Sequence, residues 1–257
     1  FDDKKFVLRS IPSGIFDEGK TNIIGNGCVI APDLFMYEAR ELEVAGYEVV
    51  QRLHISRRAH LILPTHRVLD RAYEVAKGEG KVGTTGKGIG PTYSDKAARV
   101  GLRVGDIQGD FLPKYEALKA RHLQILSDLG FTDFDITEEE KTWLEGIDYM
   151  RRFPLTDTEH EINQALAAGK NVLAEGAQGS LLDIDHGTYP FVSSSSTTVG
   201  GVCTGLGIAP QNIGRVWGIF KAYSTRVGSG PFPVELFDET GEEIRRVGKE
   251  FGAVTGR

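Results

Sequence analysis

The residues best suited to chemistry begin with a glycine-rich segment at residues 78–90, which reads GEGKVGTTGKGIG. It holds six glycines in thirteen residues, together with Thr84, Thr85 and Lys87. Glycine leaves the backbone open to close approach, so amides and hydroxyls in such a loop can converge on the oxygens of a bound phosphate. The alternative is an ordinary flexible surface loop.

Two familiar nucleotide fingerprints do not explain this loop. Residues 78–83 match the pattern GxGxxG, but a dinucleotide site needs a strand before that pattern and a helix after it. Here a helix is predicted before it, so we reject the dinucleotide interpretation. The GxxxxGK[ST] pattern of ordinary P-loop enzymes does not occur in the sequence.

The glycine-rich loop runs into the segment GIGPTYSDKAAR at residues 88–99. Pro91 suits the first turn of a helix, which places Lys96 and Arg99 three residues apart on one face. Two cations beside a glycine loop can bind an anion. The alternative is a solvated basic face.

A second candidate loop, residues 174–180, reads AEGAQGS and follows a predicted strand. In open α/β sheets, ligands bind beyond the carboxyl ends of strands, so Gln178 is well placed to meet one. Its amide can both donate and accept, which suits a purine edge. Alternatively, Gln178 only closes a turn.

Hydroxyl groups and arginines make up the remaining candidates for anion binding. Residues 193–201 read SSSSTTVGG, and their hydroxyls and amides can hold a phosphate if a cation arrives from elsewhere, with Arg99 as the natural donor. Two later polar segments contain arginine forks suited to carboxylates or phosphates: Lys221 to Arg226, and Thr255 to Arg257.

Asp183, Asp185 and His186 lie within four residues and invite a metal interpretation. In a strand, Asp183 and Asp185 would share one face. Two carboxylates and a histidine also occur together by chance, so this metal site is the weaker hypothesis. The other histidines show no ligand spacing.

Periodicity and capping patterns predict the elements that must position these residues. Strands are expected at residues 6–8, 172–174 and 216–223. Helices are expected at 33–45, with Asp33 as N-cap, at 66–77, at 113–129, and after capping boxes at Thr137/Glu140, Thr158/Glu161 and Thr240/Glu243. This alternation favours one α/β domain with a mainly parallel central sheet flanked by helices.

Composition narrows the class of protein. Of 257 residues, 40% are hydrophobic and 26% charged, which is typical of globular proteins, and the net charge of −6 argues against nucleic acid as a partner. Cys28 and Cys203 form no metal or disulfide spacing, which favours a reduced, cytoplasmic setting. We expect neither a membrane span nor a signal peptide before Phe1.

Three segments together resemble the adenylosuccinate synthetase family: residues 83–106, 172–192 and 221–236. The resemblance runs from Ile11 to the last residue in the same order, and residues 88–99 resemble one of the family's two signature segments. The other signature, an N-terminal glycine-rich loop with the catalytic aspartate, would lie before Phe1. The resemblance therefore implies a P-loop-hydrolase-like fold, incomplete at both ends, with residues 1–257 as a single truncated domain.

The resemblance also implies an activity. The family joins IMP and L-aspartate into adenylosuccinate in AMP biosynthesis, through 6-phosphoryl-IMP, with GTP hydrolysed and Mg2+ required. The family enzymes are cytoplasmic homodimers. The base, the acid and the Mg2+ ligands would lie upstream and guanine recognition downstream, so this chain alone is expected to be inactive.

Residue roles carry over where the motifs match. The resemblance implies that Thr85 and Ser193 hold the IMP 5′-phosphate, that Arg99 reaches it from the partner subunit, and that Gln178 lies against the 6-position of the base. It further implies contacts of Arg257 with ribose and aspartate and a place for Thr255 in the aspartate loop. Lys96, a signature lysine, is the catalytic candidate, with a structural or anion-supporting role. Ser193 stands where the family usually has threonine.

Two rival functions remain open from the residues alone. One is a non-catalytic module that binds purine nucleotides through the same glycine loops. The other is a metal-dependent hydrolase built on Asp183, Asp185 and His186.

Overall fold

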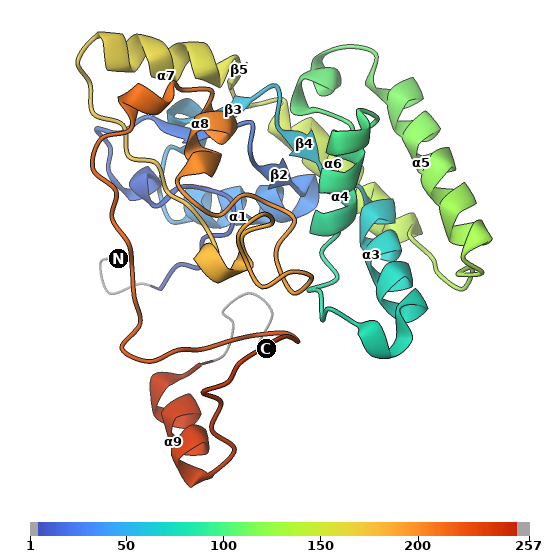
Figure 1. Ribbon diagram of the computed structural model, residues 1–257. Helices are drawn as coiled ribbons and strands as arrows, with labels where there is room; N and C mark the ends of the chain where they lie inside the picture. Colours follow the sequence, from blue (N-terminus) through green and yellow to red (C-terminus); the bar gives the residue numbers. More distant parts are fainter. Residues whose placement is uncertain (1–4, 251–257) are drawn as a thin grey trace.

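The computed structural model describes residues 5–250 and places two small parallel sheets at the centre of the chain (Figure 1). The first has the strand order β1 (Asn22–Ile24), β3 (Leu53–Ser56) and β5 (Leu155–Thr156), and the second pairs β2 (Val29–Ile30) with β4 (His60–Leu61). In register, Ile24 lies opposite Ile55, and Ile55 opposite Leu155. Both sheets are parallel, which confirms the α/β prediction.

Helices surround these strands and account for most of the regular structure. They are α1 (Pro32–Val44), α2 (Val49–Arg52), α3 (Pro64–Ala76), α4 (Ile89–Ala98), α5 (Phe111–Asp128), α6 (Thr137–Met150), α7 (Thr158–Ala167), α8 (Gly200–Leu206) and α9 (Glu239–Gly248). Short 3-10 turns lie at Ser13–Phe16, Gly78–Gly80, Val104–Gln108, Ser180–Leu182 and Pro210–Asn212. The helices predicted at 66–77 and 113–129 are confirmed as α3 and α5.

The main core forms where α6 packs on α1 and turns its aromatic face towards α5. Trp143 is fully buried, stacks on Tyr115 with ring centroids 4.9 Å apart, and donates its indole N–H to the Ile62 carbonyl at 2.7 Å. Gly146 allows the two helices to touch, because a Cβ at that position would lie 2.6 Å from the Asp33 nitrogen. The core therefore depends on one small residue at the helix crossing.

Asp33 does not cap α1 as predicted. The N-cap is Ala31, Pro32 is the first helical residue, and the buried Asp33 carboxylate accepts two hydrogen bonds from Arg67 at 2.7 and 2.9 Å. Arg67 also donates to Glu139 at 2.6 Å. Burying a carboxylate costs less free energy when a charged donor pairs with it. Asp33 therefore binds Arg67, a partner from another helix, instead of capping the first turn of α1.

The three predicted capping boxes mark real helices but do not form. Glu140 accepts hydrogen bonds from Tyr115 and Lys119 on α5, and Glu161 binds His54 Nδ1 at 2.6 Å. At α9 the cap is Asp238, whose carboxylate accepts from the Gly241 N–H at 3.1 Å. Longer-range partners compete for the same glutamates, and sequence spacing alone does not show them.

The strands predicted at 6–8, 172–174 and 216–223 are wrong for this chain. All three segments are extended or irregular, and the last two are largely solvent-exposed, with Leu173 at 88%, Trp217 at 75% and Ile219 at 98%. A strand forms only where a neighbouring backbone supplies hydrogen-bond partners, and no strand in residues 5–250 lies beside these segments. The apolar runs have strand-like composition, but no strand of the described residues pairs with them.

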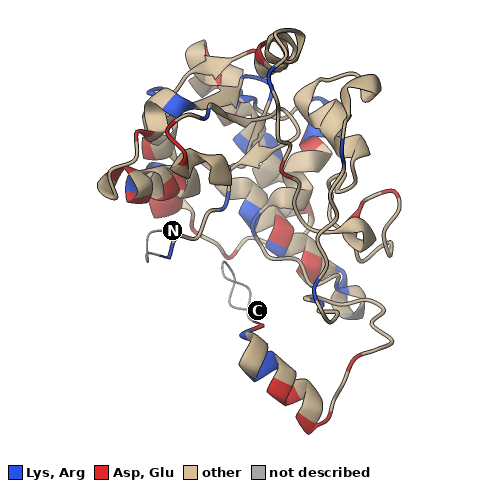
Figure 2. Ribbon diagram, turned by 90° about the vertical axis from the view of Figure 1, so that its left-hand side faces the viewer, with Lys and Arg blue, Asp and Glu red and all other residues tan. Residues whose placement is uncertain are grey.

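The last helix lies apart from the others, beyond a long extended segment (Figure 1). Its first turn carries Glu239 and Glu242 and its last turn Arg245 and Arg246, an order that complements the helix dipole. Figure 2 shows this charge separation along α9 and, elsewhere, acidic and basic residues interspersed. Within residues 5–250, no helix has the length and apolar character needed to cross a bilayer.

Candidate functional site

Helices α4 and α8 meet at a tight turn, residues 25–28, between β1 and β2. From α4, Tyr93 Oη donates to the Gly27 carbonyl at 2.7 Å and Lys96 Nζ to the Asn26 carbonyl at 3.1 Å. From the other side, the Gly27 N–H donates to the Gly205 carbonyl of α8 at 3.0 Å. A Cβ at Gly27 would lie 2.7 Å from Gly205 Cα, so glycine is required for this contact. The turn therefore joins α4 to α8, which begins at the end of the serine-rich segment, residues 193–201.

Lys96 joins α4 to the turn at residues 25–28. Its ammonium is half-buried, binds a backbone carbonyl and lies 5.8 Å from the centre of the Tyr93 ring. Burial lowers the pKa of Lys96 below its ordinary value. The side chain fastens α4 to the β1–β2 turn, which fits the structural role considered for it.

The amides of the glycine-rich loop are less open than the sequence suggests. Glu74, on α3, accepts hydrogen bonds from the N–H groups of Val82 at 3.4 Å, Gly83 at 2.8 Å and Thr84 at 3.3 Å. Burial alone would raise the pKa of Glu74, but these donors lower it. A carboxylate thus takes amides that we expected to face phosphate, while Thr85 is exposed.

The loop enters α4 through Gly88, whose backbone is left-handed with φ of +78°. Its N–H donates to Asp70 at 2.9 Å, and a Cβ there would lie 2.9 Å from His66 Cβ. Both the positive φ and the close approach favour glycine. The helix ends at Arg99, which is exposed and also left-handed, with φ of +65°.

Asp183 lies between the second candidate loop, residues 174–180, and the serine-rich segment, residues 193–201. Its carboxylate is bound by backbone donors rather than open to a metal ion. Its buried carboxylate accepts from the N–H groups of Asp185 at 3.0 Å, His186 at 3.1 Å, Thr197 at 2.7 Å and Thr198 at 3.2 Å. Burial alone would raise its pKa, but these donors lower it to about 2. The segment is a 3-10 turn and loop, so the shared strand face predicted for Asp183 and Asp185 is absent.

Hydrogen bonds beside Asp183 tie the loop after Gln178 to the serine-rich segment, residues 193–201. The Thr197 hydroxyl, beside Asp183, donates to the Gly179 carbonyl at 2.8 Å, and the Ser193 N–H donates to the Leu182 carbonyl at 2.8 Å. Gln178 is exposed and has a left-handed backbone with φ of +62°, an uncommon conformation for a residue with a Cβ. The chain next to Gln178 and the chain at Ser193 are therefore both bonded to residues around Asp183.

The serine-rich segment also approaches the start of α4. A Cβ at Gly90 would lie 3.4 Å from Ser194 Oγ, so the Ser194 side chain lies against the start of α4. Ser193 Oγ lies 3.0 Å from Ser195 Oγ. The structure thus brings Ser194, the residue after Ser193, to the end of α4 that follows the glycine-rich loop.

Arg226, noted in the sequence as an anion-binding candidate, instead links loops. Its guanidinium donates to the Ser229 carbonyl at 2.7 Å and to the Phe191 carbonyl at 3.2 Å. The Ser229 N–H in turn donates to the Val82 carbonyl at 3.4 Å. The 226–229 turn therefore connects the glycine-rich loop to the chain just before Ser193.

Thr255 and Arg257 lie outside the described residues. The surface has one hollow along α9 and another between residues 100–106 and α5. Thr85, Gln178 and Ser193 do not line either hollow. The candidate site is therefore an open convergence of loops rather than either of these hollows.

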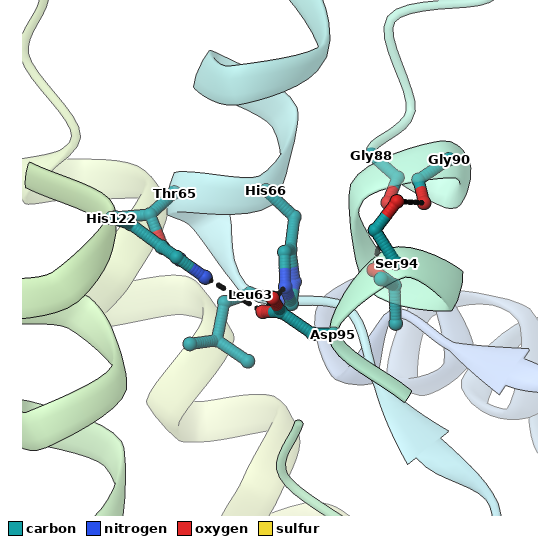
Figure 3. A network of polar contacts seen from close by, with 9 residues as sticks. Leu63, Thr65, His66, Gly88, Gly90, Ser94, Asp95 and His122 are labelled. Carbon is teal, nitrogen blue, oxygen red and sulfur yellow. Dashed lines mark hydrogen bonds and ion pairs between the residues drawn. The ribbon is translucent and has the colours of Figure 1, made fainter. Parts of the chain in front are cut away.

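Sequence reasoning missed a cluster formed by His66, Asp95 and His122, because the three residues are far apart in the chain (Figure 3). Asp95 Oδ2 lies 2.9 Å from His66 Nε2 and 2.8 Å from His122 Nε2. His66 Nδ1 accepts the Leu63 N–H at 2.9 Å, so its proton is on Nε2 and points at Asp95. A metal ion at that nitrogen would have to replace this proton, so the geometry favours a hydrogen-bonded network.

A family model described as adenylosuccinate synthetase matches residues 1–257, the whole chain. The chain belongs to the adenylosuccinate synthetase family. It is 64% identical over 257 residues to an adenylosuccinate synthetase of Bacteroides fragilis, covering all of this chain and 60% of that relative. The chain thus spans about 60% of the length of the curated relatives it matches.

Solved structures support the same placement. The fully ligated adenylosuccinate synthetase from Plasmodium falciparum superposes with a TM-score of 0.89 at 38% identity, covering all of this chain and 60% of that one. A cyanophage S-2L succinoaminodeoxyadenylate synthetase gives a TM-score of 0.52 at 19% identity, over 82% of this chain and 48% of that one, and shows a shared fold only. The family fold predicted from the motifs is therefore confirmed.

Proposed function

We propose that the full-length protein containing this chain makes adenylosuccinate from IMP and L-aspartate with hydrolysis of GTP, and that this chain supplies most of the IMP-binding surface. One observation carries the proposal beyond family membership. Hydrogen bonds around Asp183 join Gly179, next to Gln178, to Thr197 and join Ser193 to Leu182, while the Ser194 side chain lies against the start of α4 at Gly90. Three segments distant in sequence thus face one region.

In the proposed complex, Thr85 and Ser193 bind the 5′-phosphate of IMP through their hydroxyls. Gln178 faces the 6-position of the base, where its amide can donate to the oxygen as negative charge develops on it. Gln178 lies in an exposed loop and has a left-handed backbone. Thr255 and Arg257 contact L-aspartate, and Arg257 also the ribose.

Arg99 binds the same phosphate from a partner subunit of a homodimer. The phosphate site lies near Gly90, and Arg99 follows it by nine residues of a single helix. At 1.5 Å per residue, the two ends of α4 are about 13 Å apart along the axis. In each subunit the phosphate site lies at one end of α4 and Arg99 at the other. Arg99 of one subunit can therefore reach the phosphate site of its partner.

Magnesium does not fit the acidic clusters of the described residues. The Asp183 carboxylate is occupied by backbone donors, and the histidine cluster around Asp95 points protons at its carboxylate. Mg2+ needs open oxygen ligands in an octahedral arrangement. We therefore place the Mg2+ ligands, and the base that activates IMP, outside these residues.

Cys28 and Cys203 are unpaired thiols, which supports a reducing, cytoplasmic setting.

A matched pair of glutamine variants tests this function in the full-length protein. Gln178→Ala is expected to lower kcat/KM for IMP by about 100- to 1,000-fold, the effect of losing one donor to a developing oxyanion. Gln164→Ala, at an exposed position on α7, is the control and should match the unaltered protein. Adenylosuccinate is measured by chromatography. Binding of IMP without any adenylosuccinate formation would instead identify a nucleotide-binding module and contradict the proposal.

A further inference from the structure

Three polar side chains from three helices meet at one carboxylate oxygen (Figure 3). Asp95 belongs to α4, His66 to α3 and His122 to α5, and the side chains of both histidines are fully buried. Their Nε2 atoms lie 2.9 and 2.8 Å from the same Asp95 oxygen. The cluster therefore ties α4 to both neighbouring helices through a single side chain.

Each ring is fixed from its far side as well. His66 Nδ1 accepts the Leu63 N–H at 2.9 Å, and His122 Nδ1 lies 2.7 Å from Thr65 Oγ1. A buried polar network in which every nitrogen has a partner holds its members in one geometry. Neither ring can turn without leaving a buried polar atom unpaired.

The main chain of Asp95 ends α4 and sets the direction of Arg99. The Asp95 carbonyl accepts the N–H groups of Val100 at 3.0 Å and Gly101 at 3.2 Å, while the Arg99 N–H donates to the Lys96 carbonyl at 3.2 Å. These bonds close the turn in which Arg99 takes its left-handed conformation. The residue clamped by the histidines is thus the residue around which the Arg99 turn is built.

We propose that His66 and His122 are positioning residues that clamp Asp95 and thereby aim Lys96 and Arg99 at their targets. The inference rests on the proposed function, because it needs Arg99 to bind the IMP phosphate. Neither histidine touches substrate in this account. They act through the last turn of α4, where a small rotation displaces the arginine.

The experiment replaces His122 in the full-length protein and measures the KM for IMP and GTP separately. His122→Phe keeps a ring but removes both hydrogen bonds, and should raise the KM for IMP about tenfold or more while leaving that for GTP within about twofold. His122→Gln retains an amide donor that can reach Asp95, and should return the KM for IMP to within about threefold of the original. Rescue by glutamine would not be expected if only ring packing mattered.

Tyr149→Phe is the matched control, because it removes a 2.7 Å hydrogen bond from Tyr149 to Glu43 between α6 and α1, away from α4. It should lower the melting temperature without moving the KM for IMP. If His122→Phe behaves in the same way, the inference is overturned. If His122→Phe does not fold, Thr65→Val is used instead, because it removes only the hydrogen bond at His122 Nδ1. Thr65→Val should raise the KM for IMP about threefold. An unchanged KM for IMP would overturn the inference.

Two reference measurements separate this inference from the proposed function. An unaltered full-length protein that forms no adenylosuccinate would overturn both. If the unaltered protein is active and Arg99→Leu raises the KM for IMP, but neither histidine variant does, the positioning role alone fails.

Discussion

Replacing Arg99 with leucine tests the assignment of this residue to the IMP phosphate. Arg99 is exposed at the end of α4, so the substitution removes a cation without opening the core. A hydrogen bond to a charged group contributes about 1.5–3 kcal/mol, which corresponds to about a 10- to 150-fold change in affinity. We expect the KM for IMP in the full-length protein to rise by that factor and the KM for GTP to change less than about twofold. Equal increases in both constants would remove Arg99 from the phosphate site.

Mixing two variants shows whether Arg99 acts across the subunit interface. The length of α4 places Arg99 about 13 Å from the Gly90 end, and the proposed function assigns the arginine at each site to the second subunit. In a dimer of one Arg99→Leu subunit and one Gln178→Ala subunit, one site keeps both residues and the other loses both. Random mixing of equal amounts should restore about a quarter of the original activity, since half the dimers are mixed and half their sites are intact. If both residues act in the same subunit, mixing restores nothing.

Two further predictions concern stability. Gly146→Ala would place a methyl group against the Pro32 backbone and 2.6 Å from the Asp33 nitrogen. Chemical denaturation should therefore show a free energy of unfolding lower by about 1–3 kcal/mol. An unchanged free energy of unfolding would refute the close helix crossing. His60 is buried, and burial lowers its pKa to about 4, so the unfolded chain binds the proton first as the pH falls from about 6.5. Stability should therefore fall between pH 6.5 and 4, by at most about 3 kcal/mol from this group. The fall should be smaller in His60→Phe, and an NMR titration that gives His60 an ordinary pKa would contradict the prediction.

Local sequence patterns located the longer helices but not their contacts, and they missed α2 and α8. The spacing of apolar residues located α3 and α5 to within about two residues, because each helix buries one face whatever its partner is. Asp33 and Glu161 were assigned to caps from spacing, yet they pair with Arg67 and His54. Those partners are set by tertiary packing, which no local pattern records.

The strands at 172–174 and 216–223 failed for a different physical reason. Their composition is strand-like, but strand formation depends on a second backbone, and residues 5–250 offer none beside them. The motif segments themselves were found correctly, and the family resemblance they carry is confirmed by the match over the whole chain. The roles of Thr85, Arg99, Gln178 and Ser193 stay predictions.

Within the candidate site, motif reading identified loops but not what holds them. It suggested open amides near Thr84, where Glu74 already binds, and a metal role for Asp183, which instead gathers four backbone N–H groups. The cluster around Asp95 was invisible because its histidines lie 29 and 27 residues away. Only the packing of α3, α4 and α5 brings them together.

A crystal structure of the full-length protein with IMP bound tests the central claim most directly. The claim predicts phosphate oxygens at hydrogen-bond distance, about 2.7–3.0 Å, from Thr85 Oγ1 and Ser193 Oγ, with the Gln178 amide at the 6-oxygen. Arg99 of the second subunit should reach the same phosphate. IMP bound elsewhere, with these side chains facing solvent, would contradict the account.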